Sequence, residues 1–373
     1  MRSSDMPILE LSGAPYERGV QHGNQLREAI QSTLALQDKQ LTGEHGNAER
    51  EKRQFLEQCS FEAAITQWAP SLMAELQGIA DGAEVAFDDI YFLNLGDEHW
   101  SYRAEQTAAA TGETCTCFGV TDAVSAHGTV TLSGQNMDVG QWLEGMQTLF
   151  RIRPYPAGAT ALVFGHPGGI GLNGLNTASL GIACNSLLTL RAARTGLPVA
   201  FVMRRFLEHT DFDEACAFLR DAPHASGQNY LVSAPGCVRS FECAAGAVVE
   251  YQPTEDCSRV CHTNHPLVNQ NTNSVVRAAA AQASTHARMA SIYARLGRTG
   301  VEVSLSAVKA ALSAHDDPQC PVSRLGDYGD ALIGYTLASS IYELGDTPKL
   351  HIAAGPPCQT DWREVDVLGD NRA

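Results

Sequence analysis

Two cysteines one residue apart, Cys115 and Cys117, are the residues whose types and spacing most directly point to chemistry in this sequence. They lie in the small-polar run TGETCTCFGV (111–120), which leads into a stretch typical of a strand. The pair could bind a metal, act as a redox couple, pack as two small apolar residues or contain a nucleophile. Zinc sites usually space their cysteines by two to four residues, and redox pairs are more often Cys-x-x-Cys, so the spacing disfavours both uses.

A second group of possible ligands, Cys257, Cys261, His262 and His265, lies in the segment CSRVCHTNH. These residue types suit zinc. The segment alternates like a strand, however, and neighbouring residues of a strand point to opposite faces, so Cys261 and His262 are poorly placed to bind one ion. We therefore predict no metal and no cofactor, and interpret the segment as a strand end that brings a histidine and an asparagine into a site.

The nucleophile interpretation of Cys115 has more support, although a cysteine needs a base to form a thiolate at neutral pH. No His–Asp pair lies nearby in the sequence. Cutting the peptide bond before Cys115 would supply a base, because a new α-amino group has a pKa of roughly 8 and can take the thiol proton. The thiol itself could make this cut by attacking the carbonyl of Thr114, which gives a thioester that water opens.

The overall composition limits the possible classes of function. The 373 residues are 44% hydrophobic and carry a formal charge of −16, so we expect no nucleic-acid partner and no anionic membrane partner. The longest apolar runs fall well short of the roughly 20 residues of a membrane helix, and no signal peptide is recognisable. Eleven cysteines, an odd number without a tight framework, indicate reduced thiols and a cytoplasmic protein.

Hydrophobic periodicity predicts groups of helices that alternate with groups of strands. Helical patterns cover about 16–41, 50–68, 71–82, 88–95, 197–209, 211–221, 274–296 and 303–313. Strand patterns lie between 115 and 184, between 229 and 264, and in TLASSIYEL and KLHIAAG near the end. This order is typical of a layered α+β protein with mainly antiparallel sheets.

Six short motifs follow one another along nearly the whole chain. They are ILELSGAPYERGVQHG, CTCFGV with LSGQNMD, GLNTASLGIACNSL, RTGLPVAFVMRRFLE, VCHTNHPL and PVSR. In this order they resemble the motifs of the autoproteolytic acyltransferases related to fungal acyl-CoA:6-aminopenicillanate acyltransferase, which are N-terminal-nucleophile (Ntn) hydrolases. The resemblance implies a single Ntn-hydrolase domain over 1–373, built as a four-layer αββα sandwich.

The resemblance also places the cleavage site. Cys115 falls on the family's nucleophile, so the bond from Thr114 to Cys115 is predicted to break, giving fragments 1–114 and 115–373. The fragments are expected to stay together as a heterodimer that could assemble further. The family usually has glycine at the position of Thr114, whose branched side chain restricts the backbone, so cleavage could be slower or could use the Thr114 hydroxyl. Cys117 occupies a position usually filled by Ser or Thr and is assigned to substrate binding.

Further roles carry over position by position. Asp138 falls on an acidic residue near the nucleophile. Asn185 falls on the residue that binds the oxyanion, where a side-chain amide donor is needed. Arg324 falls on a site arginine suited to a carboxylate or to orienting Asp138. Asn264 and His265 are candidates for substrate binding.

One further cluster lies just upstream of the predicted cut. Glu98, His99 and Trp100, in GDEHW, could form a catalytic group. The favoured interpretation is that they line a substrate cleft or cover the precursor loop.

Together these implications predict an enzyme that transfers or hydrolyses acyl groups of small N-acyl (amide) or acyl-thioester substrates. The reaction would pass through an acyl-cysteine, with an amine or water as acceptor. One alternative is an uncleaved, inactive member that binds a small molecule, motivated by Thr114. Another is a zinc-binding protein that uses Cys257, Cys261, His262 and His265.

Overall fold

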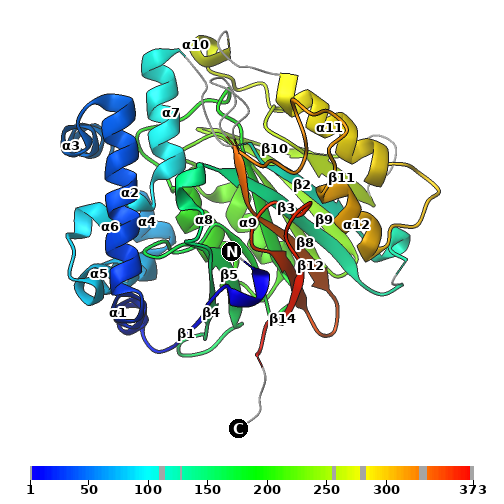
Figure 1. The fold of residues 1–373 in the computed structure, drawn as a ribbon, viewed down its shortest axis with the longest axis horizontal. Helices are drawn as coiled ribbons and strands as arrows, with labels where there is room; N and C mark the ends of the chain where they lie inside the picture. Colours follow the sequence, from blue (N-terminus) through cyan, green and yellow to red (C-terminus); the bar gives the residue numbers. More distant parts are fainter. Residues whose placement is uncertain are drawn as a thin grey trace.

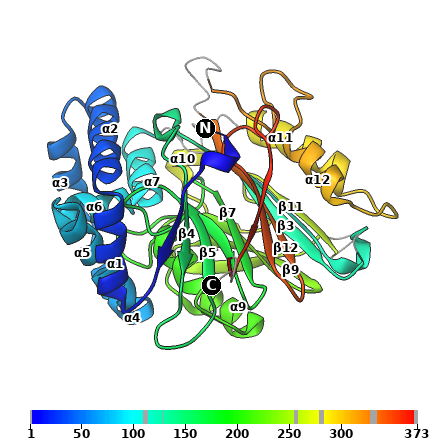
Figure 2. The same ribbon diagram turned by 60° about the horizontal axis from the view of Figure 1, so that its bottom comes forward.

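The computed structural model describes residues 2–108, 114–126, 128–253, 258–277, 283–326 and 334–369. In these residues two sheets pack face to face between helical layers (Figure 1, Figure 2). The predicted four-layer αββα sandwich is confirmed.

The larger sheet has eight strands in the order β1-β4-β5-β6-β7-β8-β9-β10. Only β1 and β4 pair in parallel, and the remaining pairs are antiparallel. The strands are β1 (Ile8–Leu11), β4 (Thr148–Ile152), β5 (Ala161–Gly165), β6 (Asn173–Asn176), β7 (Gly181–Ser186), β8 (Gln228–Ala234), β9 (Cys237–Ala244) and β10 (Ala247–Tyr251).

The smaller sheet has six strands in the order β11-β2-β3-β12-β13-β14, all antiparallel. They are β11 (Arg259–His262), β2 (Thr116–Val120), β3 (Thr131–Val139), β12 (Tyr335–Leu344), β13 (Lys349–Ala353) and β14 (Arg363–Asp366). Every residue of β2 and β3 is buried. Strands covered on both faces are expected in the middle of a layered structure, and any polar side chain there must find partners.

Helices cover the outer face of each sheet. The helices α11 (Ala283–Leu296) and α12 (Leu305–Leu312) pack on β2, β3 and β11 of the smaller sheet. The helices α8 (Val199–Phe206) and α9 (Phe212–Asp221) pack on β7 and β8 of the larger sheet. Figure 2 shows α9 and the pair α11–α12 on opposite sides of the two sheets. The short helix α10 (Ser274–Arg277) lies beside the end of α7.

The helices of the first 108 residues gather on one side of the sandwich, coloured blue to cyan in Figure 1. They are α1 (Pro15–Gln25), α2 (Arg27–His45), α3 (Ala48–Gln58), α4 (Glu62–Trp68), α5 (Pro70–Ala83), α6 (Phe87–Leu93) and α7 (Gly96–Thr107). Short 3-10 turns occur at η1 (Ser3–Asp5), η2 (Asp122–Val124) and η3 (Gln141–Leu143).

Some predicted helix boundaries are wrong. The predicted helix over 16–41 is two helices, because the backbone at Leu26 (φ −116°, ψ 21°) leaves the helical region. The predicted helix over 50–68 is also two, because Cys59 is extended (φ −121°, ψ 143°). No helix is predicted over 96–107, where α7 lies. The buried face of α7 includes Glu98, His99 and Ser101, so it lacks the apolar stripe that identifies a helix.

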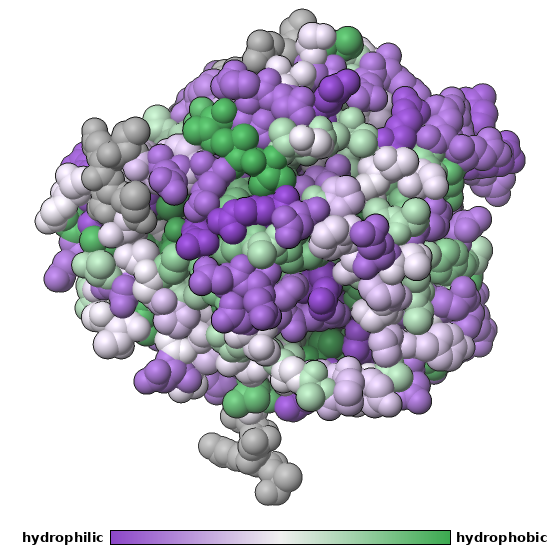
Figure 3. Space-filling view, turned by 180° about the vertical axis from the view of Figure 1, so that it is seen from behind, coloured by the Kyte–Doolittle hydropathy of each residue, from purple (hydrophilic) through white to green (hydrophobic). Residues whose placement is uncertain are grey.

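One face of the molecule shows how its exposed apolar residues are distributed. The face seen in Figure 3 is mostly hydrophilic, and its apolar residues form only small patches. Within the described ranges, no helix combines the length and the apolar character needed to span a bilayer.

Glycines allow α1 and α5 to pack backbone against backbone. Gly19 and Gly23 of α1 face Gly78 and Gly82 of α5. A Cβ atom added at Gly78 would lie 2.2 Å from the carbonyl oxygen of Tyr16. A backbone atom cannot move aside as a flexible side chain can, so the two helices would have to separate.

We expect Gly78→Ala to lower the free energy of unfolding by about 1–3 kcal/mol, the usual cost of overpacking. The matched control is Gly43→Ala in α2, where an added Cβ meets nothing within 4 Å. This control should be neutral or should stabilise by up to about 1 kcal/mol, because alanine favours helices. Urea denaturation measures both, and equal effects of the two substitutions would contradict the close-packing account.

Candidate active site

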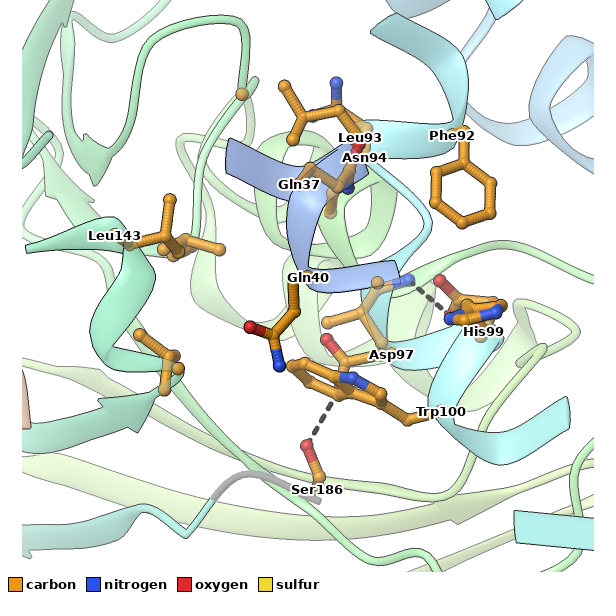
Figure 4. A pocket seen from close by; sticks show the side chains of 18 of the residues that line it. Gln37, Gln40, Phe92, Leu93, Asn94, Asp97, His99, Trp100, Leu143 and Ser186 are labelled. Atoms are coloured by element: carbon orange, nitrogen blue, oxygen red, sulfur yellow. Dashed lines mark hydrogen bonds between the residues drawn. The ribbon is translucent and has the colours of Figure 1, made fainter. Parts of the chain in front are cut away.

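Cys115 lies immediately before β2, which pairs with β11 and β3 in the smaller sheet. It is buried, with 2% of its surface exposed, and it lines a cavity of about 470 Å³. Residues of α2 and α7 line the same cavity, among them Gln40 and Asp97 (Figure 4). A rigid strand therefore presents the predicted nucleophile to a space of the size that small-molecule sites usually have.

The backbone of Cys115 is held from both sides. Its N–H donates to Oδ1 of Asn264 at 2.8 Å, and its carbonyl oxygen accepts from Nη1 of Arg288 at 2.6 Å. The Nη2 atom of Arg288 also donates to Oδ1 of Asn264, at 3.0 Å. Cys115, Asn264 and Arg288 thus form a closed ring of hydrogen bonds.

Asn264 sits in the loop after β11 and is itself positioned by several contacts. Its Nδ2 donates to the carbonyl oxygen of Ser186 at 3.0 Å, and its backbone N–H donates to Oγ1 of Thr285 at 2.8 Å. The carboxylate of Glu242, on β9, lies under the same loop. This carboxylate accepts from the N–H groups of Leu267, Val268 and Asn269 and contacts Nε2 of His262.

Asp138 lies on β3 next to the predicted cleavage site and is fully buried. Its Oδ1 accepts from Oγ1 of Thr336 at 2.6 Å, and its Oδ2 accepts from Oγ1 of Thr114 at 3.3 Å. The backbone N–H of Thr114 donates to the carbonyl oxygen of Asp138 at 3.3 Å. Burial raises the pKa of Asp138 to about 6, although Arg324 and Arg288 oppose this rise.

Two fully buried arginines flank this carboxyl group. Nη1 of Arg324 and Nε of Arg288 both donate to Oγ of Ser284, at 3.0 and 3.3 Å. Arg324 also donates through Nε to the carbonyl oxygen of Gly334 at 3.3 Å. Burial lowers the pKa of Arg288 to about 10, so this side chain stays charged at neutral pH. The structure therefore brings together Cys115, Asp138, Asn264 and Arg324, all named from the sequence.

Arg288 is a site residue that the sequence analysis missed. It lies on α11 in the series Ser284, Arg288, Ile292 and Leu296, whose members recur every four residues and are all buried. An arginine within the buried stripe of a helix needs polar partners, because a buried unpaired charge is costly. The position of Arg288 in this buried series was the sequence feature that could have identified it as a site residue.

Asn185 and Cys117 lie deeper between the sheets than Cys115. Nδ2 of Asn185 donates to the carbonyl oxygen of His262 at 3.4 Å, and its Oδ1 accepts from Asn229 at 3.0 Å. The sulfur of Cys117 lies 3.5 Å from the carbonyl oxygen of Cys184. Burial raises the pKa of Cys117 well above its usual value, so its thiol is poorly suited to act as a nucleophile.

His265 helps to fix the loop after β11 to α11. Its Nδ1 lies 2.9 Å from Oγ1 of Thr285, and its ring lies 4.1 Å from that of His286. Burial, together with the neighbouring His286, lowers the pKa of His265 to about 4. The ring is therefore neutral near pH 7 and acts here as an anchor of the loop.

The predicted alternative zinc group does not assemble in the described residues. Cys261 packs with apolar side chains such as Phe118 and Ile292, whereas His262 faces Glu242 across the other side of the strand. Cys257 lies outside the described residues. The expectation that neighbouring strand residues face apart therefore holds for this pair.

A different set of metal-ligand types occurs in the N-terminal helices. His45, Glu51 and His99 place one ligand atom each within 4.8 Å of one another. Nε2 of His99 already contacts Oε1 of Glu51 at 2.9 Å, and Arg103 lies 3.5 Å from the same oxygen. The carboxylate is thus shared with an arginine, which disfavours a metal ion at this place.

Residues of the GDEHW segment line the cavity, as favoured from the sequence. Asp97, Glu98, His99 and Trp100 all contribute to its wall. Figure 4 shows Asp97 bonded to Ser186, with Trp100 beside it. The segment faces the same space as Cys115.

Two sheets packed face to face between helical layers are the αββα arrangement of an N-terminal-nucleophile hydrolase fold, and Cys115 lies directly before β2. Residues 128–357, more than half of the chain, match the family described as acyl-coenzyme A:6-aminopenicillanic acid acyl-transferase. The chain belongs to this acyl-transferase family. The matched range contains Asp138, Asn264 and Arg324 and begins after Cys115.

Two solved structures of conjugated bile acid hydrolase variants from Clostridium perfringens also resemble the chain. Each is 12% identical, and the TM-scores are 0.45 and 0.44. The alignments cover 68% and 67% of this chain and 93% and 92% of the hydrolase chains. Similarity at this level supports no conclusion about the substrate of the present chain.

Proposed function

We propose that this chain is a self-cleaving cysteine enzyme that transfers or hydrolyses acyl groups of small N-acyl or acyl-thioester substrates. The observation that carries the proposal is the placement of Cys115, which lies directly before the buried strand β2, lines the cavity and has its nitrogen held by Asn264. An N-terminal nucleophile needs its sulfur and its nitrogen fixed together in a site.

In the proposed cleavage step, the Cys115 thiol attacks the carbonyl carbon of Thr114. The peptide nitrogen leaves as the α-amine of Cys115, so a thioester joins the two residues. Water then hydrolyses the thioester to a Thr114 carboxylate and restores the thiol. The α-amine does not exist before this step, so another base must take the thiol proton.

Asp138 suits the role of that first base. It contacts Thr114 through both its carboxylate and its carbonyl group, so it lies beside the bond to be broken. With a pKa of about 6, its carboxyl group is largely ionised at neutral pH and can still accept a proton. The thiol proton passes to Asp138 and then to the departing nitrogen.

In the proposed catalytic cycle, the α-amine of Cys115 takes the thiol proton and Oδ1 of Asn264 holds that amine. The thiolate attacks the substrate carbonyl, and an acyl-cysteine forms as the substrate amine or thiol leaves with a proton. A second amine or water then releases the acyl group. Arg288 and Arg324 place two positive charges against the single carboxylate of Asp138, which favours the thiolate.

Asn264 is the better placed amide for the oxyanion. It already contacts the nitrogen of Cys115, and its Nδ2 carries two hydrogens, of which the Ser186 carbonyl takes one. The amide of Asn185 instead binds His262 and Asn229. We therefore propose Asn264 as the oxyanion donor and Asn185 as a positioning residue that acts through the strand of His262.

The contacts between the two predicted fragments support a heterodimer after cleavage. Strand β1 of the first fragment pairs with β4 of the second. Glu75 bonds to Arg18 within the first fragment at 2.7 Å and to Arg204 of the second at 2.9 Å, and all three are buried. Separation would expose this buried ion cluster together with shared apolar core.

A second candidate function is an uncleaved binding protein. The observation that favours a binding protein is the tight packing of Thr114 against Gly334. A Cβ atom added at Gly334 would lie only 2.8 Å from Oγ1 of Thr114. Self-cleavage requires the backbone at Thr114 to distort, and such packing resists distortion. The acylation experiment below separates the two candidates.

The pH dependence of self-cleavage tests the role of Asp138. Only the ionised carboxylate accepts a proton, so the cleavage rate should rise with pH through about 6 and then level off. At pH 5 it should be about tenfold below the plateau. Precursor refolded from inclusion bodies at different pH values, sampled over time on denaturing gels, gives the rates.

A substitution of Asp138 and a matched control at Asp122 test the same role independently of pH. Asp138→Asn should slow cleavage by about a hundredfold or more, the usual contribution of a general base. Asp122→Asn in η2, outside the site, should change the rate little. A pH profile that is flat between 5 and 8 would rule out Asp138 as the base.

The enzymatic proposal is tested by trapping the acyl-cysteine. Rapid acid quenching after mixing with a p-nitrophenyl ester or an N-acyl p-nitroanilide, followed by peptide mapping, should find the acyl group on Cys115. An acyl group on a residue other than Cys115 would favour the binding protein instead. Measurable binding of the same compounds without any acylation would favour it as well.

A further inference from the structure

The start of α7 carries two carboxyl groups that the proposed mechanism does not use. Asp97 and Glu98 are adjacent in the first turn of the helix, and both line the cavity that contains Cys115. Glu98 is 4% exposed. Acids at such a position are rare unless a charge partner or a ligand compensates them.

Asp97 is held by donors from the larger sheet. Its Oδ1 accepts from Oγ of Ser186 and from Nε2 of Gln228, both at 2.7 Å. Figure 4 shows Asp97 on one side of the cavity, with Gln40 reaching toward it from α2. The carboxyl group is thereby fixed in one orientation at the cavity wall.

Glu98 is satisfied on one oxygen only. Its Oε1 accepts from Oγ of Ser226 at 2.8 Å and from the N–H of Val199 at 3.1 Å. Its Oε2 is buried and has no hydrogen-bond partner. A buried acceptor without a donor costs about 1–3 kcal/mol, so Glu98 is an incompletely satisfied acid directly beside Asp97.

Among the described residues, no ion pair of Asp97 or Glu98 is found, and no basic side chain is among the main causes of their shifts in pKa. Burial raises the pKa of Asp97, and burial together with Asp97 raises the pKa of Glu98 to about 8. A positive charge brought by a ligand would favour the ionised forms.

The acids are connected to the nucleophile through a short chain of contacts. The Ser186 hydroxyl donates to Asp97, and the Ser186 carbonyl accepts from Asn264, which holds the nitrogen of Cys115. The wall also contains apolar side chains, which include Leu41, Phe92, Met137, Trp142, Leu143 and Leu172, and a second polar group formed by Glu44, His45 and Arg103. A ligand that fills the cavity thus meets apolar surface together with the acidic pair Asp97 and Glu98.

We propose that Asp97 and Glu98 form a subsite for a positively charged amine, and that the substrates are amphiphilic N-acyl compounds bearing an ammonium group. The proposal rests on the function proposed above, because it names the substrate class of that site. Asp97 binds the ammonium group directly, and the adjacent carboxyl group of Glu98 adds to the acidic character of the subsite.

Binding to an inactive variant tests the subsite without requiring catalysis. In Cys115→Ala protein, 4-phenylbutylamine should bind at least about tenfold more tightly than 4-phenylbutan-1-ol, as measured by calorimetry. Adding Asp97→Asn, or separately Glu98→Gln, should remove most of this preference. Adding Asp88→Asn, which changes an exposed acid on α6, should preserve it. Equal affinities for amine and alcohol, no binding of either, or a preference that survives both cavity substitutions would overturn the proposal.

Turnover then distinguishes this inference from the function on which it rests. The wild-type enzyme should show a higher kcat/KM for a 6-aminohexanoyl anilide than for the hexanoyl anilide, and Asp97→Asn should abolish that ratio. Amine binding without any turnover would contradict the enzymatic proposal alone. Turnover with equal kcat/KM for both anilides would contradict the ammonium subsite alone.

Discussion

Replacing Cys115 by alanine is expected to leave a single uncleaved chain of 40.0 kDa with no acyl-transfer activity. Cys115 lines the cavity and directly follows Thr114, whereas Cys184, the other cysteine among the lining residues, lies within β7. The substitution removes the group that cuts the chain and, with it, the α-amine that would serve as the base. Denaturing gels and an acyl-transfer assay measure the two losses.

Cys117→Ala is the matched control. Cys117 is fully buried between the sheets, and burial raises the pKa of its thiol, so the variant should still cleave and turn over. Loss of a buried sulfur should cost about 1 kcal/mol of stability at most. If cleavage persisted in Cys115→Ala but stopped in Cys117→Ala, Cys117 and not Cys115 would be the nucleophile.

Asn264→Ala is expected to lower kcat/KM by on the order of a hundredfold to a thousandfold, the usual cost of losing one oxyanion donor. The same substitution also releases the nitrogen of Cys115 from its acceptor at 2.8 Å. Because cleavage itself can be affected, the kinetic constants should be normalised to the cleaved fraction of each preparation. The loss should lie mainly in kcat, since the donor acts on the transition state.

Asn185→Ala separates the two candidate amides. If Asn185 only positions the strand of His262, its removal should lower kcat less than Asn264→Ala does and should also lower the midpoint of thermal unfolding. A loss in kcat for Asn185→Ala that equals or exceeds the loss for Asn264→Ala, with unchanged stability, would restore Asn185 as the oxyanion donor predicted from the sequence.

The parts of the site that sequence reasoning reached are those carried by short local motifs. Cys115 directly precedes β2, Asp138 is the second-last residue of β3 and Asn264 follows β11, and each lies in a motif with a recognisable order of residue types. The local structure at such positions depends on residues nearby in the sequence, so a sequence motif is enough to identify them. Their meeting in space depends on the pairing of β11, β2 and β3, which the αββα layering supplies.

Residues that act from a distance could not be placed in this way. Arg288 lies 173 positions from Cys115, and the two meet only because α11 packs on β2 and β11. Likewise, α7 has a polar buried face because it borders the cavity, so hydrophobic periodicity fails where the function needs polar groups. The sequence does not reveal the break between α1 and α2 at Leu26, because the helical spacing of apolar residues continues across it.

The central claim is that the chain breaks between Thr114 and Cys115 and that the new amine is the catalytic base. Intact-mass analysis of the purified, active protein under denaturing conditions tests this most directly. The account predicts two polypeptides, residues 1–114 and 115–373, with an unblocked cysteine at the start of the larger one. A fully active preparation that gives one mass of 40.0 kDa would contradict it.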